Sequence, residues 1–238
     1  MTFIIGCCFG SFGYLLATRL PKNSSLFPPS HCEACNTRLS WLELIPLLSF
    51  LLQKGRCRHC QTKIPLDYLI AEITCGLLFT LCLNYSPANP IITCFWLYSA
   101  WLLSISDYYF KILETSIFLV TSLVLWLGQS YLKMPFHWQT FLYCLLFAAL
   151  FSYYYREKLG VGDLLLLLAW SPWLSFWQFS MLLFLSSSFG LLYFIVAKLL
   201  QKNSDRLPFI PFLSCGLFLV LHFNKTIHAL FILAWELP

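Results

Sequence analysis

Apolar runs of about twenty residues recur along this chain, and they restrict the solvent in which it can fold. Of its 238 residues, 59% are hydrophobic and only 11% are charged. In a soluble domain roughly a quarter of the residues are charged, because a folded surface in water needs polar groups. The mean hydropathy is +0.74. The sequence therefore predicts an all-α, polytopic integral membrane protein.

The positions of the runs predict a bundle of about eight transmembrane helices. The stretch 163–200 is long enough for a helical hairpin, and Ser171-Pro172 favours a break inside it. We interpret the first run as a retained helix rather than a signal peptide, because Arg19 and Lys22 follow it. Residues 226–237 form a further short or re-entrant apolar segment. The predicted spans are 2–20, 66–85, 90–106, 112–132, 137–155, the two halves of 163–200, and 207–223. In outline, the chain has a first transmembrane helix (1–20), a polar loop (21–65) and a multi-span domain (66–238).

The polar loop 21–65 sets the predicted orientation. Its acidic residues, Glu33 and Glu43, are outnumbered by basic ones: Lys22, Arg38, Lys54, Arg56, Arg58 and Lys63. The positive-inside rule places such a loop in the cytoplasm, and the net charge of +5 then requires no nucleic-acid partner. Counting the spans onward puts Asp107, at the end of the third, and Asp163, at the start of the sixth, at the cytoplasmic membrane boundary.

These two aspartates are the first candidate site residues. A carboxylate at membrane depth is costly and suggests a function; the alternative is that each aspartate simply caps a helix end. Asp163 lies in Gly160-Val161-Gly162-Asp163, where glycines permit close approach of a substrate strand. Two carboxyl groups that share a proton can act together as acid and base. We therefore predict that Asp107 and Asp163 are catalytic and that Gly160 and Gly162 help to position a substrate.

Four cysteines in the polar loop are the second candidate site. Cys32 and Cys35 form one C-x-x-C pair, and Cys57 and Cys60 form another. The spacing is close to that of tetrahedral zinc sites, and four thiolates leave no open coordination position. The sequence predicts a structural zinc ion, with free thiols or reducible disulfides as the alternatives. The apolar run 44–52 in the same loop is too short to span, and we expect it to enter the membrane interface.

The order of motifs resembles the type IV prepilin leader peptidases, which are membrane aspartic proteases of the G-x-G-D class. The likeness covers nearly the whole chain and is closest to the Gram-positive competence branch. Four positions depart from the usual family pattern: Leu69, Glu114, Leu165 and Ile210. These departures affect the expected positioning of the substrate more than the two aspartates, which are both present. The matching motifs are Gly10-Ser11-Phe12 with Arg19-Leu20-Pro21, the two cysteine pairs, Leu44 to Ser49, Tyr68 with Glu72, Asp107, the G-x-G-D and Pro208-Phe209-Ile210-Pro211-Phe212.

This resemblance implies an endopeptidase in the bacterial cytoplasmic membrane, with its active site facing the cytoplasm. Its substrates would be prepilin-like proteins with a short basic leader, a glycine before the cut and an apolar helix after it. The resemblance also implies N-methylation of the new N-terminus from S-adenosylmethionine, although no segment resembles a glycine-rich cofactor loop. Two other hypotheses are a proton-coupled transporter and a zinc-dependent membrane scaffold. Transporters often have repeated halves, which this sequence lacks.

Overall fold

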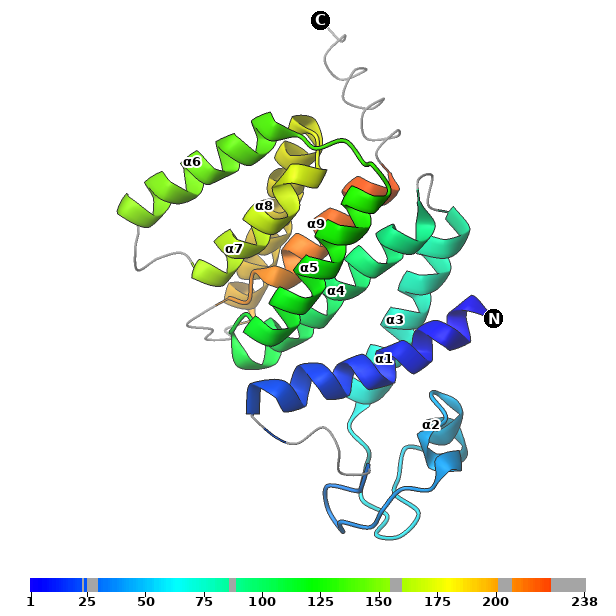
Figure 1. The fold of residues 1–238 in the computed structure, drawn as a ribbon. Coiled ribbons are helices and arrows are strands. Elements are labelled where there is room, and N and C mark those ends of the chain that lie inside the picture. The colour runs from blue at the N-terminus through cyan, green and yellow to red at the C-terminus, as the bar shows by residue number, and fades with distance from the viewer. Residues whose placement is uncertain (23, 25–29, 86–88, 155–159, 201–206, 224–238) are drawn as a thin grey trace, which may run out of the picture. The chain divides into compact units, whose positions relative to one another are not determined.

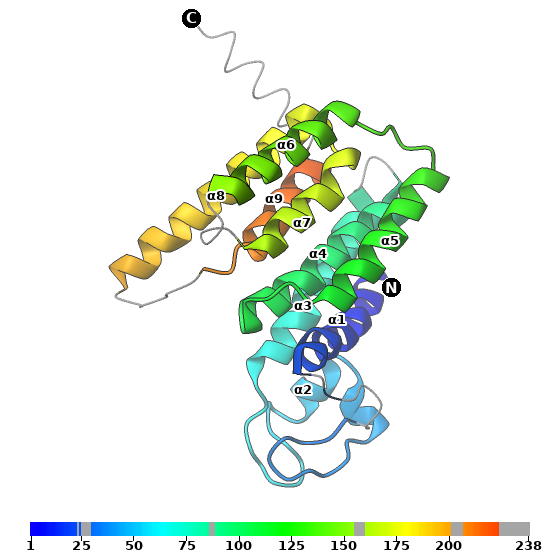
Figure 2. The same ribbon diagram turned by 60° about the vertical axis from the view of Figure 1, so that its left-hand side comes forward.

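The chain folds into helices at the places where apolar runs predict them (Figures 1 and 2). The computed structural model describes residues 1–22, 24, 30–85, 89–154, 160–200 and 207–223. Within these residues the only β structure is two isolated bridges, so the all-α prediction is confirmed. The predicted segment 226–237 lies outside the described residues. The long helices are α1 (Thr2–Arg19), α3 (Leu66–Tyr85), α4 (Pro90–Phe110), α5 (Thr115–Tyr131), α6 (Trp138–Tyr154), α7 (Val161–Trp170), α8 (Phe176–Leu199) and α9 (Ile210–His222).

Among the described residues, three segments are long and apolar enough to cross a membrane: Thr2–Lys22, Leu66–Asn84 and Phe176–Leu199. Shorter apolar helical segments cover Thr115–Tyr131, Val161–Trp173 and Ile210–His222. The predicted break at Ser171-Pro172 is a short 3₁₀ turn, Ser171–Trp173, between α7 and α8. Many large apolar side chains on α5, α6 and α8 are exposed, as expected for helices that face lipid. The chain is a helical membrane protein, and the number of eight spans stays a prediction.

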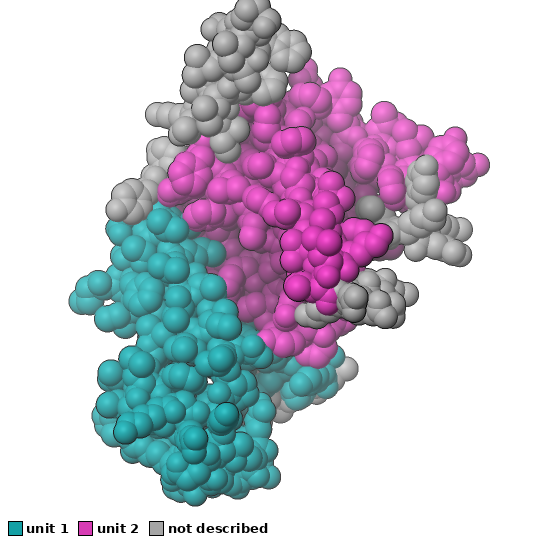
Figure 3. Space-filling view, turned by 180° about the vertical axis from the view of Figure 1, so that it is seen from behind, with its two compact units in different colours: residues 1–85 teal, residues 86–238 magenta. Residues whose placement is uncertain are grey.

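The chain divides into two compact units, Met1–Tyr85 and Ser86–Pro238 (Figure 3). In the first unit, α1 packs closely along α3 because glycines remove side chains from the interface. A Cβ atom at Gly6 would lie 2.8 Å from the carbonyl oxygen of Cys75, and one at Gly10 would lie 2.8 Å from that of Ala71. Glycines four residues apart are typical of close helix pairs in membranes, where small residues let backbones approach.

In the second unit, α4 packs against both α5 and α9, and α8 also packs against α9. Leu103 on α4 and Leu213 and Leu217 on α9 are completely or almost completely buried. Polar contacts also join these helices, since the hydroxyls of Ser104 and Ser214 lie 2.6 Å apart. This packing fixes the start of α9 beside the end of α4.

A candidate aspartate pair and a candidate metal centre

Asp107 lies in the last turn of α4 and is only 7% exposed. Its Oδ2 accepts a hydrogen bond of 3.0 Å from the backbone N–H of Ile210, the first residue of α9. The first N–H groups of a helix have no partner within the helix, and they lie at the positive end of the helix dipole. The start of α9 therefore holds the Asp107 carboxyl group in place.

Asp163 lies in the first turn of α7 and is half-buried. The glycine before it allows the start of α7 to approach the connection between α4 and α5. A Cβ atom at Gly162 would lie only 2.7 Å from the Cβ of Leu113 in that connection. Gly160 is the N-cap residue of α7, and a Cβ atom there would lie 3.1 Å from Oδ2 of Asp163. Gly160 thus keeps a side chain away from the Asp163 carboxyl group, whereas Gly162 lets the start of α7 lie directly against Leu113.

The structure brings the two aspartates together. They are close enough for their carboxyl groups to interact electrostatically. In Figures 1 and 2, the α4–α5 turn, the start of α7 and the start of α9 lie at the same end of the second unit. Residues separated by more than fifty positions along the chain therefore share one site, and such a pair has the chemistry needed for acid–base catalysis.

The backbone at Ile210 is a functional group that the sequence did not reveal. Ile210 departs from the glycine that the resemblance leads one to expect, but its contact with Asp107 uses the backbone N–H, which any residue except proline offers. The sequence signal that was available is Pro211, because proline is favoured in the first turn of a helix and so marks a helix start. Leu165, another departure, is exposed on α7.

The four loop cysteines converge in the first unit. Their sulfur atoms all lie within 4.8 Å of one another, and those of Cys32 and Cys60 are 3.7 Å apart. A tetrahedral ion with metal–sulfur bonds of about 2.3 Å requires sulfur atoms about 3.8 Å apart. All four thiols are free. The group has the geometry of a four-thiolate metal site.

Two similar turns, which we call the first knuckle (residues 31–38) and the second knuckle (residues 56–63), carry these cysteines. An antiparallel bridge joins His31 to Arg38 in the first and Arg56 to Lys63 in the second. In each knuckle the first cysteine donates its N–H to a threonine carbonyl, at 3.0 Å and 2.9 Å. The residue after each second cysteine, Asn36 or Gln61, has a positive φ. The underlying sequence repeat is Cys-x-x-Cys, then Asn or Gln, then Thr, then a basic residue. This repeat predicts two turns of similar shape, which the cysteine spacing alone does not reveal.

Each knuckle favours, at its second cysteine, the thiolate form that a metal ion binds. The side chain and backbone of Thr62 hydrogen-bond to the Cys60 thiol and lower its pKa to about 6. The side chain and backbone of Thr37 likewise lower the pKa of Cys35. One cysteine of each knuckle is therefore prepared for coordination.

Helix α3 holds the loop at two points. The hydroxyl of Tyr68 donates to Oε1 of Glu33, which lies between the cysteines of the first knuckle, at 3.0 Å. One turn further on, Oε2 of the buried Glu72 accepts from the backbone N–H of Leu47 at 2.8 Å, and Glu72 is also hydrogen-bonded to the side chain of Ser11. The spacing of Tyr68 and Glu72 thus serves to dock the loop on α3.

Fold and site define a class: a helical membrane protein with an aspartate pair at helix ends and a four-cysteine loop. Residues 4–85 match the family described as the bacterial peptidase A24 N-terminal domain. The chain is 32% identical over 210 residues to a type 4 prepilin-like proteins leader peptide-processing enzyme of Escherichia coli O78:H11. That match covers 82% of this chain and 76% of the relative. The chain belongs to the family of prepilin leader peptidases.

Two further relatives carry the name prepilin leader peptidase/N-methyltransferase. The one from Bacillus subtilis is 29% identical over 245 residues, with 97% of this chain and 96% of the relative covered. The one from Myxococcus xanthus is 42% identical over 83 residues, with 34% of this chain and 25% of the relative covered. No solved structure matches the chain significantly. The likeness to the Bacillus protein over nearly both full lengths agrees with the predicted resemblance to the Gram-positive competence branch.

Proposed function

We propose that this protein is a membrane-embedded aspartic endopeptidase that removes the leader peptide of prepilin-like proteins. The observation that carries this proposal is the pairing of Asp107 with Asp163 at helix ends in a membrane protein of the prepilin leader peptidase family. Few acidic residues lie within the apolar helices, and two of them are close enough for their carboxyl groups to interact. Family membership supplies the substrate class, and the geometry supplies the chemistry.

In the proposed reaction, one carboxylate takes a proton from a water molecule as the water oxygen attacks the scissile carbonyl carbon. The other carboxyl group, which carries a proton, polarises the carbonyl oxygen and gives that proton to it. Collapse of the tetrahedral intermediate breaks the C–N bond, and a proton passes to the leaving amine nitrogen. The Ile210 N–H limits rotation of the Asp107 carboxyl group, so its orientation is set before the substrate binds.

The substrate that fits this site has a short basic leader, a glycine before the cut and an apolar helix that follows. Gly160 leaves space for an extended segment beside Asp163, and Gly162 helps to place that aspartate by lying against Leu113. A glycine at the cleavage position lets two backbones approach closely. The apolar helix would remain in the bilayer. The excess of basic residues in the loop 21–65 supports placing the site at the cytoplasmic face of the cell membrane.

We further propose that Cys32, Cys35, Cys57 and Cys60 bind a structural zinc ion. The sulfur separations fit a tetrahedral ion, and the four thiolates would fill its coordination shell. When bound, the ion would cross-link the two knuckles and take no part in proteolysis. The names of these relatives, which include N-methyltransferase, also support a second activity, N-methylation of the new N-terminus. S-adenosylmethionine as the methyl donor rests on the family resemblance alone.

Co-expression with a prepilin-like substrate tests the peptidase proposal. The wild type should remove the leader, whereas Asp107→Asn and Asp163→Asn should each leave the substrate at full length. Asp67→Asn is a matched control, because Asp67 is an exposed aspartate in the first turn of α3, in the other unit. Efficient cleavage by either mutant of the pair, at normal abundance in the membrane, would exclude that aspartate from the mechanism.

A further inference from the structure

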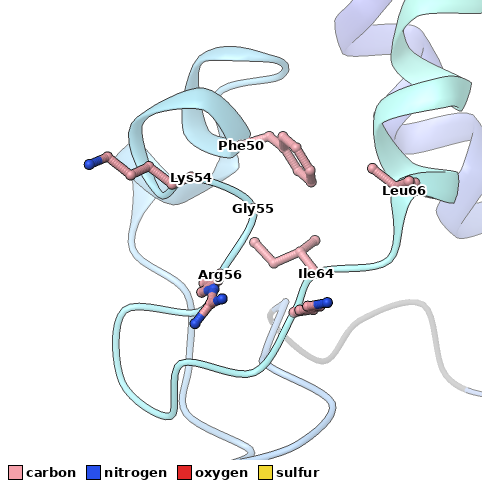
Figure 4. A pocket seen from close by; sticks show the side chains of 7 residues that line it. Phe50, Lys54, Gly55, Arg56, Ile64 and Leu66 are labelled. Atoms are coloured by element: carbon pink, nitrogen blue, oxygen red, sulfur yellow. The ribbon is translucent and has the colours of Figure 1, made fainter.

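An open cavity of about 330 Å³ lies between the short helix α2 (Leu48–Leu52), the second knuckle and the start of α3 (Figure 4). Its lining includes both apolar and basic residues. Phe50, Ile64 and Leu66 form an apolar floor, and their side chains point toward one another in Figure 4. The basic residues Arg56 and Lys63 form the rim, and Lys54, which also lines the cavity, points away from the floor in Figure 4. A ligand that fits this cavity would have an anionic end and an apolar end.

The basic rim lacks a counter-charge. Arg56 and Lys63 face each other across the antiparallel bridge of the second knuckle, where directly opposed like charges are unfavourable. Both side chains are exposed, and within the residues that the structure describes neither forms an ion pair with a carboxylate. In the first knuckle the corresponding pair is His31 and Arg38, which has only one permanent charge. A bound anion would offset the repulsion in the second knuckle.

The apolar floor continues along α3. Leu66 belongs to the cavity and also begins a row of exposed residues with Ile70, Ile73 and Leu77, which are between 37% and 60% exposed. Intervals of four, three and four residues place all four side chains on one face of the helix. The segment Leu66–Asn84 is long and apolar enough to span a membrane. The cavity therefore opens onto a surface that suits a hydrocarbon chain.

We propose that this cavity is a binding site for an anionic phospholipid. The phosphate lies between Arg56 and Lys63, and an acyl chain follows the row from Leu66 to Leu77. Basic pockets at the membrane surface bind the head groups of anionic lipids in this way. A free phosphate would not use the apolar row, and a basic peptide would be repelled by the rim. The lipid attaches the second knuckle to the membrane, which gives the four-cysteine loop a fixed position relative to the bilayer.

This inference rests on the membrane assignment and not on the proposed peptidase activity. Its test therefore measures bound lipid. The full chain is placed in nanodiscs of phosphatidylcholine alone or of phosphatidylcholine with phosphatidylglycerol, and retained lipid is counted by native mass spectrometry. The wild type should retain phosphatidylglycerol selectively. Each cation near an anionic surface contributes roughly a fivefold gain, so Arg56→Gln with Lys63→Gln should lower retention about 25-fold.

The matched control is Arg38→Gln with Arg58→Gln, which removes the same charge from the same loop at residues that do not line the cavity. It should change retention less than about threefold, because diffuse attraction is screened. Equal losses of retained phosphatidylglycerol in the two double mutants would contradict the proposed lipid site. Lys63→Gln alone, expected to lower retention about fivefold, keeps the test decisive if the double mutant folds poorly.

A second comparison separates a lipid from free phosphate. Leu66→Ser should lower retention of phosphatidylglycerol, because it places a hydroxyl where the acyl chain would lie. Inorganic phosphate, added as a competitor, should displace the lipid only weakly. Normal lipid retention by Leu66→Ser together with complete displacement by inorganic phosphate would overturn the lipid assignment and leave a simple phosphate site.

Discussion

The two candidate sites of this protein are built in opposite ways. The cysteine site comes from two short knuckles, in which each pair of ligands lies within four residues of sequence and a local hydrogen bond shapes each turn. The aspartate site comes from three helix ends, at residues 107, 163 and 210, and exists only when the tertiary structure brings these ends of α4, α7 and α9 near one another. A local site depends on turn chemistry, whereas a long-range site depends on helix packing. The two should therefore respond differently to substitution.

The largest effect on the cleavage rate is expected from substitutions in the aspartate pair. We expect Asp107→Asn and Asp163→Asn each to lower the rate of leader cleavage on the order of a thousandfold or more, because an amide cannot exchange the proton. The double mutant should lie within about tenfold of either single mutant, since the two residues act as a unit. Cleavage rates of purified protein on a synthetic leader peptide measure this. Losses that multiply in the double mutant would mean that the two acids act independently.

The dependence on helix packing can be tested at Gly162. An added Cβ atom there would meet the Cβ of Leu113 at 2.7 Å, so Gly162→Ala should push the start of α7 away from the α4–α5 connection. A displacement of about 1 Å at a catalytic group costs on the order of a hundredfold in rate. Gly190→Ala on α8 is the matched control, because its nearest neighbours would lie at an ordinary 3.8 Å.

A second substitution, at Leu113, tests whether its contact with the new methyl group at position 162 causes the loss of rate. Leu113→Gly removes the atom that the new methyl group would meet, so the double mutant with Gly162→Ala should recover part of the lost rate. Equal activities of Gly162→Ala and Gly190→Ala would show that the close approach at Gly162 does not position Asp163.

The local site should give a smaller effect on catalysis and a larger one on the loop. We expect about one zinc ion per chain, and Cys32→Ser or Cys57→Ser should each abolish its retention because binding and loop folding are coupled. Cleavage between residues 30 and 65 by added protease should increase, while peptidase activity should fall roughly tenfold or less, since a closed site has no open coordination position.

Cys8→Ser is the control for this experiment, because Cys8 is an exposed thiol in the same unit that does not belong to the cluster. Metal analysis by mass spectrometry and limited proteolysis provide the measurements. If Cys32→Ser were as inactive as Asp163→Asn while its loop resisted protease, the cysteine loop would contribute directly to substrate binding.

The smallest expected effect concerns the attachment of the loop to α3. Tyr68→Phe removes the hydrogen bond to Glu33, and an exposed bond of this kind contributes on the order of 1 kcal/mol. Hydrogen exchange in the first knuckle should accelerate about fivefold, with little change in the second knuckle. A double-mutant cycle with Glu33→Gln measures the coupling. Coupling near zero would show that Glu72, through Leu47, holds the loop by itself.

Much of the fold was readable from local sequence. Runs of apolar residues predicted the helices because a bilayer requires continuous stretches of hydrogen-bonded, lipid-soluble backbone. The break at Ser171-Pro172 followed from proline, which lacks the N–H that a helix interior needs. The cysteine cluster could also be predicted, since two C-x-x-C turns bring their ligands together over short distances.

What the sequence determined by itself is therefore the set of helices, the local shape of each knuckle and the chemical types of the site residues. Only the tertiary structure decided that the N–H of Ile210 meets Asp107, that Gly162 lies against Leu113 and that Glu72 holds Leu47. The physical reason is that periodicity and turn chemistry act between neighbours in the chain. Contacts between residues from 25 to about a hundred positions apart depend on which surfaces pack together, and uniformly apolar helices carry little pattern to specify that choice.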